Sequence, residues 1–340
     1  MSAPFDAVLV VSFGGPNGLD DIRPFLANVL RGRRVSPERV EEVARHYELF
    51  GGVSPITEIT RRQASGLASR LREAGQPLPV YVGMRNWHPF LADTLREMHA
   101  AGVRRAIGFI AAAQHSYSSC QQYRENVAAA RAQLREPGSD VGDVDVTFVG
   151  SWFDHPGFIA ANAAHVRAAR ERLDASVREG ARLVCTAHSI PTTMAERSRY
   201  REQLLESSRL VAEAADMRDW ALVYQSRSGR PEDPWLEPDV RDYLRASRRE
   251  GLGAAVLCPI GFVCDHVEVL YDLDREAAEL CARIDLPMTR AEAVNDDPRF
   301  LDMMADMVMR TIGRHEHGRP LPIAPAPESL AAGARTTTRS

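Results

Sequence analysis

The stretch ARLVCTAHSIP, residues 181–191, holds the pattern that decides the fold. Its apolar residues run almost without interruption up to His188, and Pro191 then forces the chain to turn. A short apolar run of this kind is typical of a strand that is buried on both faces of a parallel sheet. The sequence therefore predicts a central strand over 181–188, with an imidazole at its carboxyl end.

Similar runs recur along the chain. They cover 6–13, 79–84, 104–111, 144–150, 220–226, 253–260 and, more weakly, 289–294, and helical patterns separate them. Strands that alternate with helices indicate parallel sheets covered on both faces. We expect an α/β fold of two similar Rossmann-like domains, 1–150 and 151–312, each with a four-stranded parallel sheet flanked by helices. Residues 313–340 are rich in Pro, Ala, Ser and Thr and predict a disordered tail.

The composition excludes several classes of protein. With 44% hydrophobic and 26% charged residues among 340, the chain is typical of a soluble globular protein. A net charge of −4 gives no reason to expect nucleic acid as a partner. Lys is absent, which excludes a Walker A lysine and a Schiff-base lysine. No apolar run approaches the roughly 20 residues of a transmembrane segment, and no basic leader precedes the first strand, so a cytoplasmic protein is predicted.

The cysteines and glycines give no sign of a cofactor. Zinc ribbons and thioredoxin-type sites need a C-x-x-C pair, and none is present among the five cysteines, Cys120, Cys185, Cys258, Cys264 and Cys281. We expect these thiols to pack as small apolar groups. No G-x-G-x-x-G follows a predicted strand, so no dinucleotide site is predicted.

A second stretch, DHVEVLYDLDREAAEL at 265–280, combines an apolar stripe with a line of acids. The stripe predicts an amphipathic helix, since its members recur at spacings of three and four: Val267, Leu270, Leu273, Ala277 and Leu280. Glu268, Asp272 and Glu276 follow one another at i+4, and like charges at that spacing repel. The line is either a solvated face or a set of oxygen ligands that attracts a divalent cation.

The ends of the predicted strands favour the second interpretation. Ligands of open α/β sheets collect outside the carboxyl ends of the strands. His188 lies at one such end, a long polar loop with Trp235 follows the strand at 220–226, and the acid line follows the strand at 253–260. A structural role for His188 is the alternative. An imidazole can accept protons and ligate a metal, so His188 and Glu268 predict acid–base or metal chemistry, with Asp272 and Glu276 as a metal path.

Six motifs then show a resemblance to a known family. They are FGGVSPIT (50–57), GMRNWHPFLADTL (83–95), SYSSCQQYREN (116–126), AHSIP (187–191), YQSRSG with PWLEPD (224–239) and GFVCDHVEVLYDLDRE (261–276). In this order and combination they closely resemble the ferrochelatase family over about residues 5 to 312. The residues of the motifs at 83–95 and 116–126 are most similar to the actinobacterial branch of the family. That branch resembles enzymes that insert Fe²⁺ into coproporphyrin III.

The resemblance implies a chelatase-type fold and a role for each matched residue. The catalytic positions fall on His188 and Glu268. The metal positions fall on these two and on the secondary acids Asp272 and Glu276. Positions that contact the porphyrin fall on Ser54, Tyr123, Arg85, Trp235, His46 and Tyr47.

This chain departs from the family pattern in three places. Phe13 stands where some relatives have a tyrosine that ligates iron, and Phe cannot ligate. His46 stands before Tyr47 where some relatives have Arg, which changes the expected binding of a propionate. Many relatives carry a [2Fe–2S] cluster on closely spaced C-terminal cysteines, but no cysteine follows Cys281, so no such cluster is predicted.

The resemblance predicts an enzyme of haem biosynthesis that inserts Fe²⁺ into coproporphyrin III to give coproheme. Fe²⁺ and the porphyrin are then substrates, no cofactor is required, and transient contact with other haem-pathway enzymes is allowed. The alternatives are protoporphyrin IX as substrate, another metal or tetrapyrrole, a non-catalytic porphyrin or haem carrier, and a two-lobed solute-binding protein. The joint presence of His188, Glu268, Asp272 and Glu276 argues against a carrier, which has no need of a proton acceptor.

Overall fold

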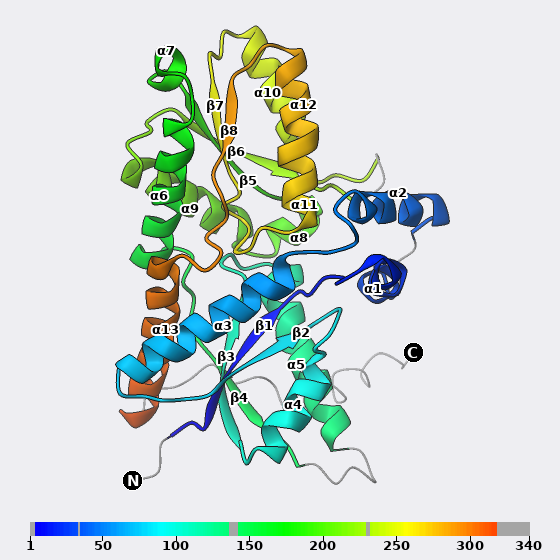
Figure 1. The fold of residues 1–340 in the computed structure, drawn as a ribbon, viewed down its shortest axis with the longest axis vertical. Helices are drawn as coiled ribbons and strands as arrows, with labels where there is room; N and C mark the ends of the chain where they lie inside the picture. The colour runs from blue at the N-terminus through cyan, green and yellow to red at the C-terminus, as the bar shows by residue number, and fades with distance from the viewer. Residues whose placement is uncertain (1–3, 33–34, 136–141, 229–231, 318–340) are drawn as a thin grey trace, which may run out of the picture.

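Eight parallel strands form two sheets of four in the computed structural model, which describes residues 4–32, 35–135, 142–228 and 232–317 (Figure 1). The first sheet has the order β2-β1-β3-β4, with β1 (Ala7–Ser12), β2 (Val80–Met84), β3 (Arg105–Ile110) and β4 (Asp145–Phe148). The second has the order β6-β5-β7-β8, with β5 (Arg182–His188), β6 (Trp220–Gln225), β7 (Ala255–Cys258) and β8 (Met288–Arg290). Each strand overlaps a predicted run, and the two sheets share one topology. The predicted α/β fold class is confirmed.

Helices cover both faces of each sheet. The first half contains α1 (Ile22–Val29), α2 (Pro37–Glu48), α3 (Ile56–Glu73), α4 (Leu91–Ala100) and α5 (Gln122–Leu134), with a 3₁₀ turn at Leu19–Asp21 and a π-helical turn at Tyr117–Gln121. The second contains α6 (Pro156–Glu171), α7 (Ala175–Arg178), α8 (Thr192–Glu196), α9 (Tyr200–Ala214), α10 (Val240–Arg249), α11 (Val267–Val269), α12 (Ala278–Arg283) and α13 (Pro298–Glu316). In the described residues, no helix is long and apolar enough to cross a bilayer.

The predicted helix at 265–280 exists, but it is not a continuous α-helix. Residues Leu270–Ala277, between α11 and α12, form a π-helix. The side chains that enter the core here, Val269, Leu273 and Ala277, recur every fourth residue. That spacing exceeds the 3.6 residues of an α-helical turn, so the wider π turn keeps them closer to one face. The same spacing keeps Glu268, Asp272 and Glu276 in line.

The last helix returns to the first half of the molecule. Helix α13 packs against both α3 and α6, and Figure 1 shows it crossing α3 beside the first sheet. It also continues to Glu316, into the stretch predicted as a disordered tail, because the ring of His315 packs edge-on against Phe5 at 5.2 Å. Residues 318–340 of that predicted tail lie outside the described residues.

Candidate active site

The carboxyl end of β5 and the start of α11 bring His188 and Glu268 together. His188 Nε2 lies 3.9 Å from Glu268 Oε2, and both side chains are partly exposed. The other ring nitrogen, Nδ1, lies 2.5 Å from the carbonyl oxygen of Ser189. A carbonyl can only accept, so Nδ1 carries the proton of the neutral ring. Nε2 is therefore left with a free lone pair that faces the site.

Asp272 is bound to the end of the neighbouring strand. Gln225, which pairs in register with His188, donates from Nε2 to Asp272 Oδ2 at 3.2 Å, and the hydroxyl of Ser226 donates to the same oxygen. Burial raises the pKa of Asp272 to about 7, and the charges of Glu268 and Glu276 add to the shift while the bond from Ser226 opposes it. At neutral pH this carboxyl is poised between its two protonation states.

Glu276, the last residue of the acid line, forms an ion pair with Arg241. Its carboxylate lies 3.0 Å from Arg241 Nη1, and Arg241 also approaches Asp239 at 3.3 Å. Burial raises the pKa of Glu276, and Arg241 works against that rise. Asp272 and Glu276 thus contact β6 and α10, while Glu268 lies near His188 of β5 and stays partly exposed.

The strand ends of the first sheet supply an aromatic and cationic group. Phe13 follows β1 and Arg85 follows β2. The guanidinium carbon of Arg85 lies 5.7 Å from the ring centroid of Phe13 and 5.3 Å from that of Tyr123 in α5, a distance at which cation and ring attract. Tyr123 is buried, which raises its pKa to about 12. Arg85 and Tyr123, predicted from separate motifs, therefore meet.

Helix α2 carries the predicted pair His46 and Tyr47 to the π-helix, and Figure 1 shows α2 next to α11. The ring of His46 stacks on Tyr271 with centroids 3.6 Å apart, and burial lowers its pKa. Tyr47 packs in a core cluster with Phe25 and Val267, where burial raises its pKa and the charge of Glu268 adds to the rise. Both residues therefore lie near the start of the acid line.

The remaining predicted residues lie in loops. Ser54 is buried against the loop after β1, because Gly15 has no side chain there; a Cβ on Gly15 would lie 2.5 Å from that of Ser54. Trp235 is half-buried and forms a bridge with Pro191, just beyond His188. The polar loop after β6 is thereby fixed to the loop after β5.

Sequence reasoning missed three partners of the acid line, namely Gln225, Ser226 and Arg241. Ser226 has a left-handed backbone, with φ of 58°, that turns its hydroxyl toward Asp272. Its place in YQSRSG, as the last residue of the predicted strand run 220–226, was the available signal. Arg241 has no comparable signal, since only the packing of α10 beside the π-helix brings it to Glu276.

The four predicted metal ligands do not form a preassembled cage. Within residues 4–32, 35–135, 142–228 and 232–317, no group of three or more His, Cys, Asp or Glu side chains is arranged to hold a metal ion. His188 and Glu268 form a pair, while Asp272 and Glu276 follow with other partners.

The chain matches the family model Ferrochelatase over residues 5–312. It is 48% identical over 312 residues to a ferrochelatase of Rhodopirellula baltica, with 92% of this chain and 87% of the relative covered. It is 47% identical over 332 residues to a coproporphyrin III ferrochelatase of Streptomyces griseus, with 93% and 88% covered. A coproporphyrin III ferrochelatase of Mycobacteroides abscessus is 44% identical over 319 residues, with 93% and 90% covered.

Solved structures support the fold. The sirohydrochlorin chelatase SirB from Bacillus subtilis subspecies spizizenii superposes with a TM-score of 0.54 at 10% identity, covering 92% of this chain and 97% of that one. At such identity the likeness speaks for the fold alone. The family model and the relatives span nearly the whole chain, and the predicted family is confirmed. The chain belongs to the ferrochelatase family, and is thus a lyase of haem biosynthesis.

Proposed function

We propose that this enzyme inserts Fe²⁺ into coproporphyrin III to give coproheme, with His188 and Glu268 as its catalytic residues. The observation that carries the catalytic part is the orientation of His188, whose Nδ1 is fixed by the Ser189 carbonyl while Nε2 faces Glu268. The relatives from Streptomyces and Mycobacteroides that are named coproporphyrin III ferrochelatases support the choice of porphyrin.

Metal insertion requires two protons to leave the pyrrole nitrogens while the ion approaches from outside the ring plane. Binding energy spent on bending the macrocycle exposes the nitrogen lone pairs. His188 Nε2 then accepts a proton from one pyrrole, and Glu268 can accept the second. Their separation of 3.9 Å is too long for a hydrogen bond, so Nε2 is not already occupied by the carboxylate.

Fe²⁺ enters along the acid line in this proposal. It meets Glu276 first, where it competes with Arg241, and passes Asp272 on the way to Glu268. Each carboxylate replaces part of the hydration shell with oxygen ligands that suit a divalent ion. Because Asp272 has a pKa of about 7, it can lose its proton as the ion arrives.

In this proposal the porphyrin lies against the aromatic and cationic residues at the strand ends of the first sheet. The guanidinium of Arg85 can pair with a propionate, and the half-buried ring of Trp235 offers a flat apolar surface to a macrocycle. Tyr123, whose ring lies 5.3 Å from that guanidinium, is a further proposed contact. Ser54, His46 and Tyr47 are further proposed contacts. Coproporphyrin III has four propionates and protoporphyrin IX has two, so carboxylate pairing discriminates between them.

Anaerobic insertion of Fe²⁺ into the two porphyrins, measured side by side, tests the proposal. We expect kcat/KM for coproporphyrin III to exceed that for protoporphyrin IX at least roughly 10-fold, the value of one charged contact of about 1.4 kcal/mol. A preference for protoporphyrin IX would identify that porphyrin as the substrate. Binding of either one without insertion would make the protein a carrier.

The variant His188→Ala is the control for this assay. Loss of the proton acceptor should lower kcat by about 10²- to 10⁴-fold while porphyrin affinity stays the same. His315→Ala, at the exposed end of α13, changes the same side chain far along the chain from the site and should retain wild-type turnover. Normal turnover in His188→Ala would remove His188 from the catalytic role.

A further inference from the structure

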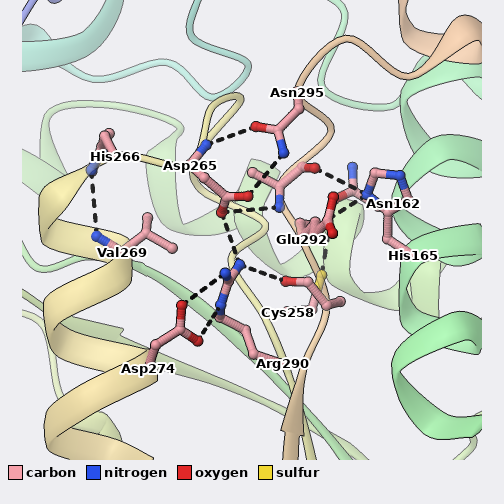
Figure 2. A network of polar contacts seen from close by, with 12 residues as sticks. Asn162, His165, Cys258, Asp265, His266, Val269, Asp274, Arg290, Glu292 and Asn295 are labelled. Atoms are coloured by element: carbon pink, nitrogen blue, oxygen red, sulfur yellow. Dashed lines mark hydrogen bonds and ion pairs between the residues drawn. The ribbon is translucent and has the colours of Figure 1, made fainter. Parts of the chain in front are cut away.

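The segment that carries the acid line is held on its other side by Arg290, the last residue of β8 (Figure 2). The guanidinium donates twice to Asp274 on the π-helix, from Nε at 2.6 Å and from Nη2 at 2.9 Å. Its remaining nitrogen, Nη1, donates to Asp265 Oδ1 at 2.8 Å. The side chains of Arg290 and Asp265 are each 12% exposed, so their contact is made largely out of water, while Asp274 lies nearer the surface.

Asp265 is itself fixed by Asn295. The side-chain amide of Asn295 donates to Asp265 Oδ2 at 2.8 Å, and the backbone N–H of Asp265 donates back to Asn295 Oδ1 at 2.8 Å. Asn295 has a left-handed backbone, with φ of 45°, and its carbonyl accepts a bond of 2.7 Å from Gln63 in α3. The network in Figure 2 is thus anchored to the first half of the molecule.

The two carboxylates that Arg290 holds lie on either side of the proposed catalytic residue. Asp265 lies three residues before Glu268, and Asp274 lies six residues after it. Between them, the backbone N–H of Val269 donates to His266 Nδ1 at 3.4 Å, which caps α11. A π-helix is rare and occurs most often at functional sites. The guanidinium of Arg290 therefore fixes both ends of the stretch from Asp265 to Asp274, which contains Glu268.

We propose that Arg290 is a positioning residue for metal insertion: by holding Asp265 and Asp274 together, it fixes the rotation of the π-helix so that Glu268 and Asp272 face the site. It acts through these residues and does not touch substrate. The inference rests on the proposed roles of Glu268 and Asp272. Bidentate contact matters here, because two parallel bonds fix the orientation of Asp274 as well as its distance.

Asp274→Asn is the sharpest test, because changes at Arg290 itself leave the buried carboxylate of Asp265 without its cation and threaten folding. Asp274 is exposed, and the variant keeps the Arg290–Asp265 contact. We expect kcat for Fe²⁺ insertion to fall roughly 10-fold, as small misplacements of catalytic groups do. The KM for Fe²⁺ should rise and the KM for porphyrin should stay the same. Asp274→Glu, which restores a carboxylate, should recover part of the loss.

Glu279→Gln is the matched control. Glu279 lies on α12, carries the same charge and pairs with Arg275 at 3.7 Å rather than with Arg290. Equal kinetics for Asp274→Asn and Glu279→Gln would overturn the inference, and so would a fall in Tm accompanied by equal rises in both KM values. Glu268→Gln is assayed in parallel: if it is inactive, such a result counts against Arg290 alone, and if it stays active, the proposed function fails together with the inference.

Discussion

At the residue scale, the site contains polar side chains that use one atom for a hydrogen bond to the protein and leave another atom available. His188 uses one nitrogen on Ser189 and keeps the other free. That His188 and Glu268 lie close together could be predicted, because His188 ends one apolar strand, the segment with Glu268 follows another, and the carboxyl ends of parallel strands share one edge of the sheet. Ser226 donates to Asp272, and Arg241 pairs with Glu276. Arg241 could not be predicted, since its place depends on how α10 packs beside the π-helix.

Asp272 gives a stability test at this scale. Its pKa is 3.8 in an unfolded chain and about 7 in the fold, so folding favours the protonated form and ionisation costs stability. Asp272→Asn removes that cost and keeps an oxygen for Gln225 and Ser226. In metal-free protein, the gain in unfolding free energy should grow from about pH 4 to pH 7 and stay constant above, reaching on the order of 1 to 3 kcal/mol.

Urea unfolding of both proteins at pH 5, 6.5 and 8 measures this gain. Asp242→Asn, an exposed Asp on α10 in a local pair with Arg245, is the control and should show no such growth with pH. A gain for Asp272→Asn that is the same at all three pH values would mean that its ionisation is not the cause.

At the element scale, the π-helix is the feature that the sequence hides. Apolar residues at spacings of three and four predict a helix of the right extent, and the i+4 spacing of the acids predicts their alignment. Arg290 binds this segment from β8, and the core behind Leu273 draws on several other elements. Local pattern cannot report contacts of that range.

The acid line predicts different kinetic effects for its members. Glu268 lies beside His188, while Asp272 and Glu276 lie about one and two turns farther on and cannot reach a pyrrole proton. Asp272→Ala and Glu276→Ala should therefore raise the KM for Fe²⁺ with the porphyrin KM unchanged, and high Fe²⁺ should restore turnover. Glu268→Ala should remove activity at any Fe²⁺ concentration. Steady-state assays over a range of Fe²⁺ concentrations separate these outcomes. Glu279→Ala, on α12 directly after the π-helix, is the control. Equal losses of activity in all three acid variants, unrelieved by added Fe²⁺, would exclude a metal path.

At the scale of the whole molecule, the two sheets and the number of strands in each follow from the sequence. The contact between the two halves of the chain, where α13 packs on α3, does not. Eight apolar runs separated by helical patterns are enough to predict two parallel sheets of four, which the structure contains. The hydrophobic pattern of α13 does not show that this helix returns to pack on α3. A glycine inside α3, Gly66, was the one signal of a close helix crossing, since glycine weakens a helix unless space requires it.

Gly66→Ala tests how far this junction supports the fold and the site. A Cβ at Gly66 would lie 2.4 Å from Leu301 Cδ1 of α13, a buried side chain with little room to move. Overpacking of this kind costs about 1 to 3 kcal/mol, which outweighs the roughly 1 kcal/mol that Ala gains over Gly in a helix. Tm should fall, and turnover should fall with it, because Gln63 of the same helix holds the carbonyls of Val263 and Asn295 beside the catalytic segment.

Gly313→Ala is the matched control, because Gly313 also lies in a helix, α13, but a Cβ there would meet no atom within 4 Å. The control should raise Tm through helix propensity and leave turnover unchanged, so the two substitutions act in opposite directions. A rise in Tm for both would show that α3 and α13 can separate without cost. The crossing would then be a consequence of the fold rather than a support for it.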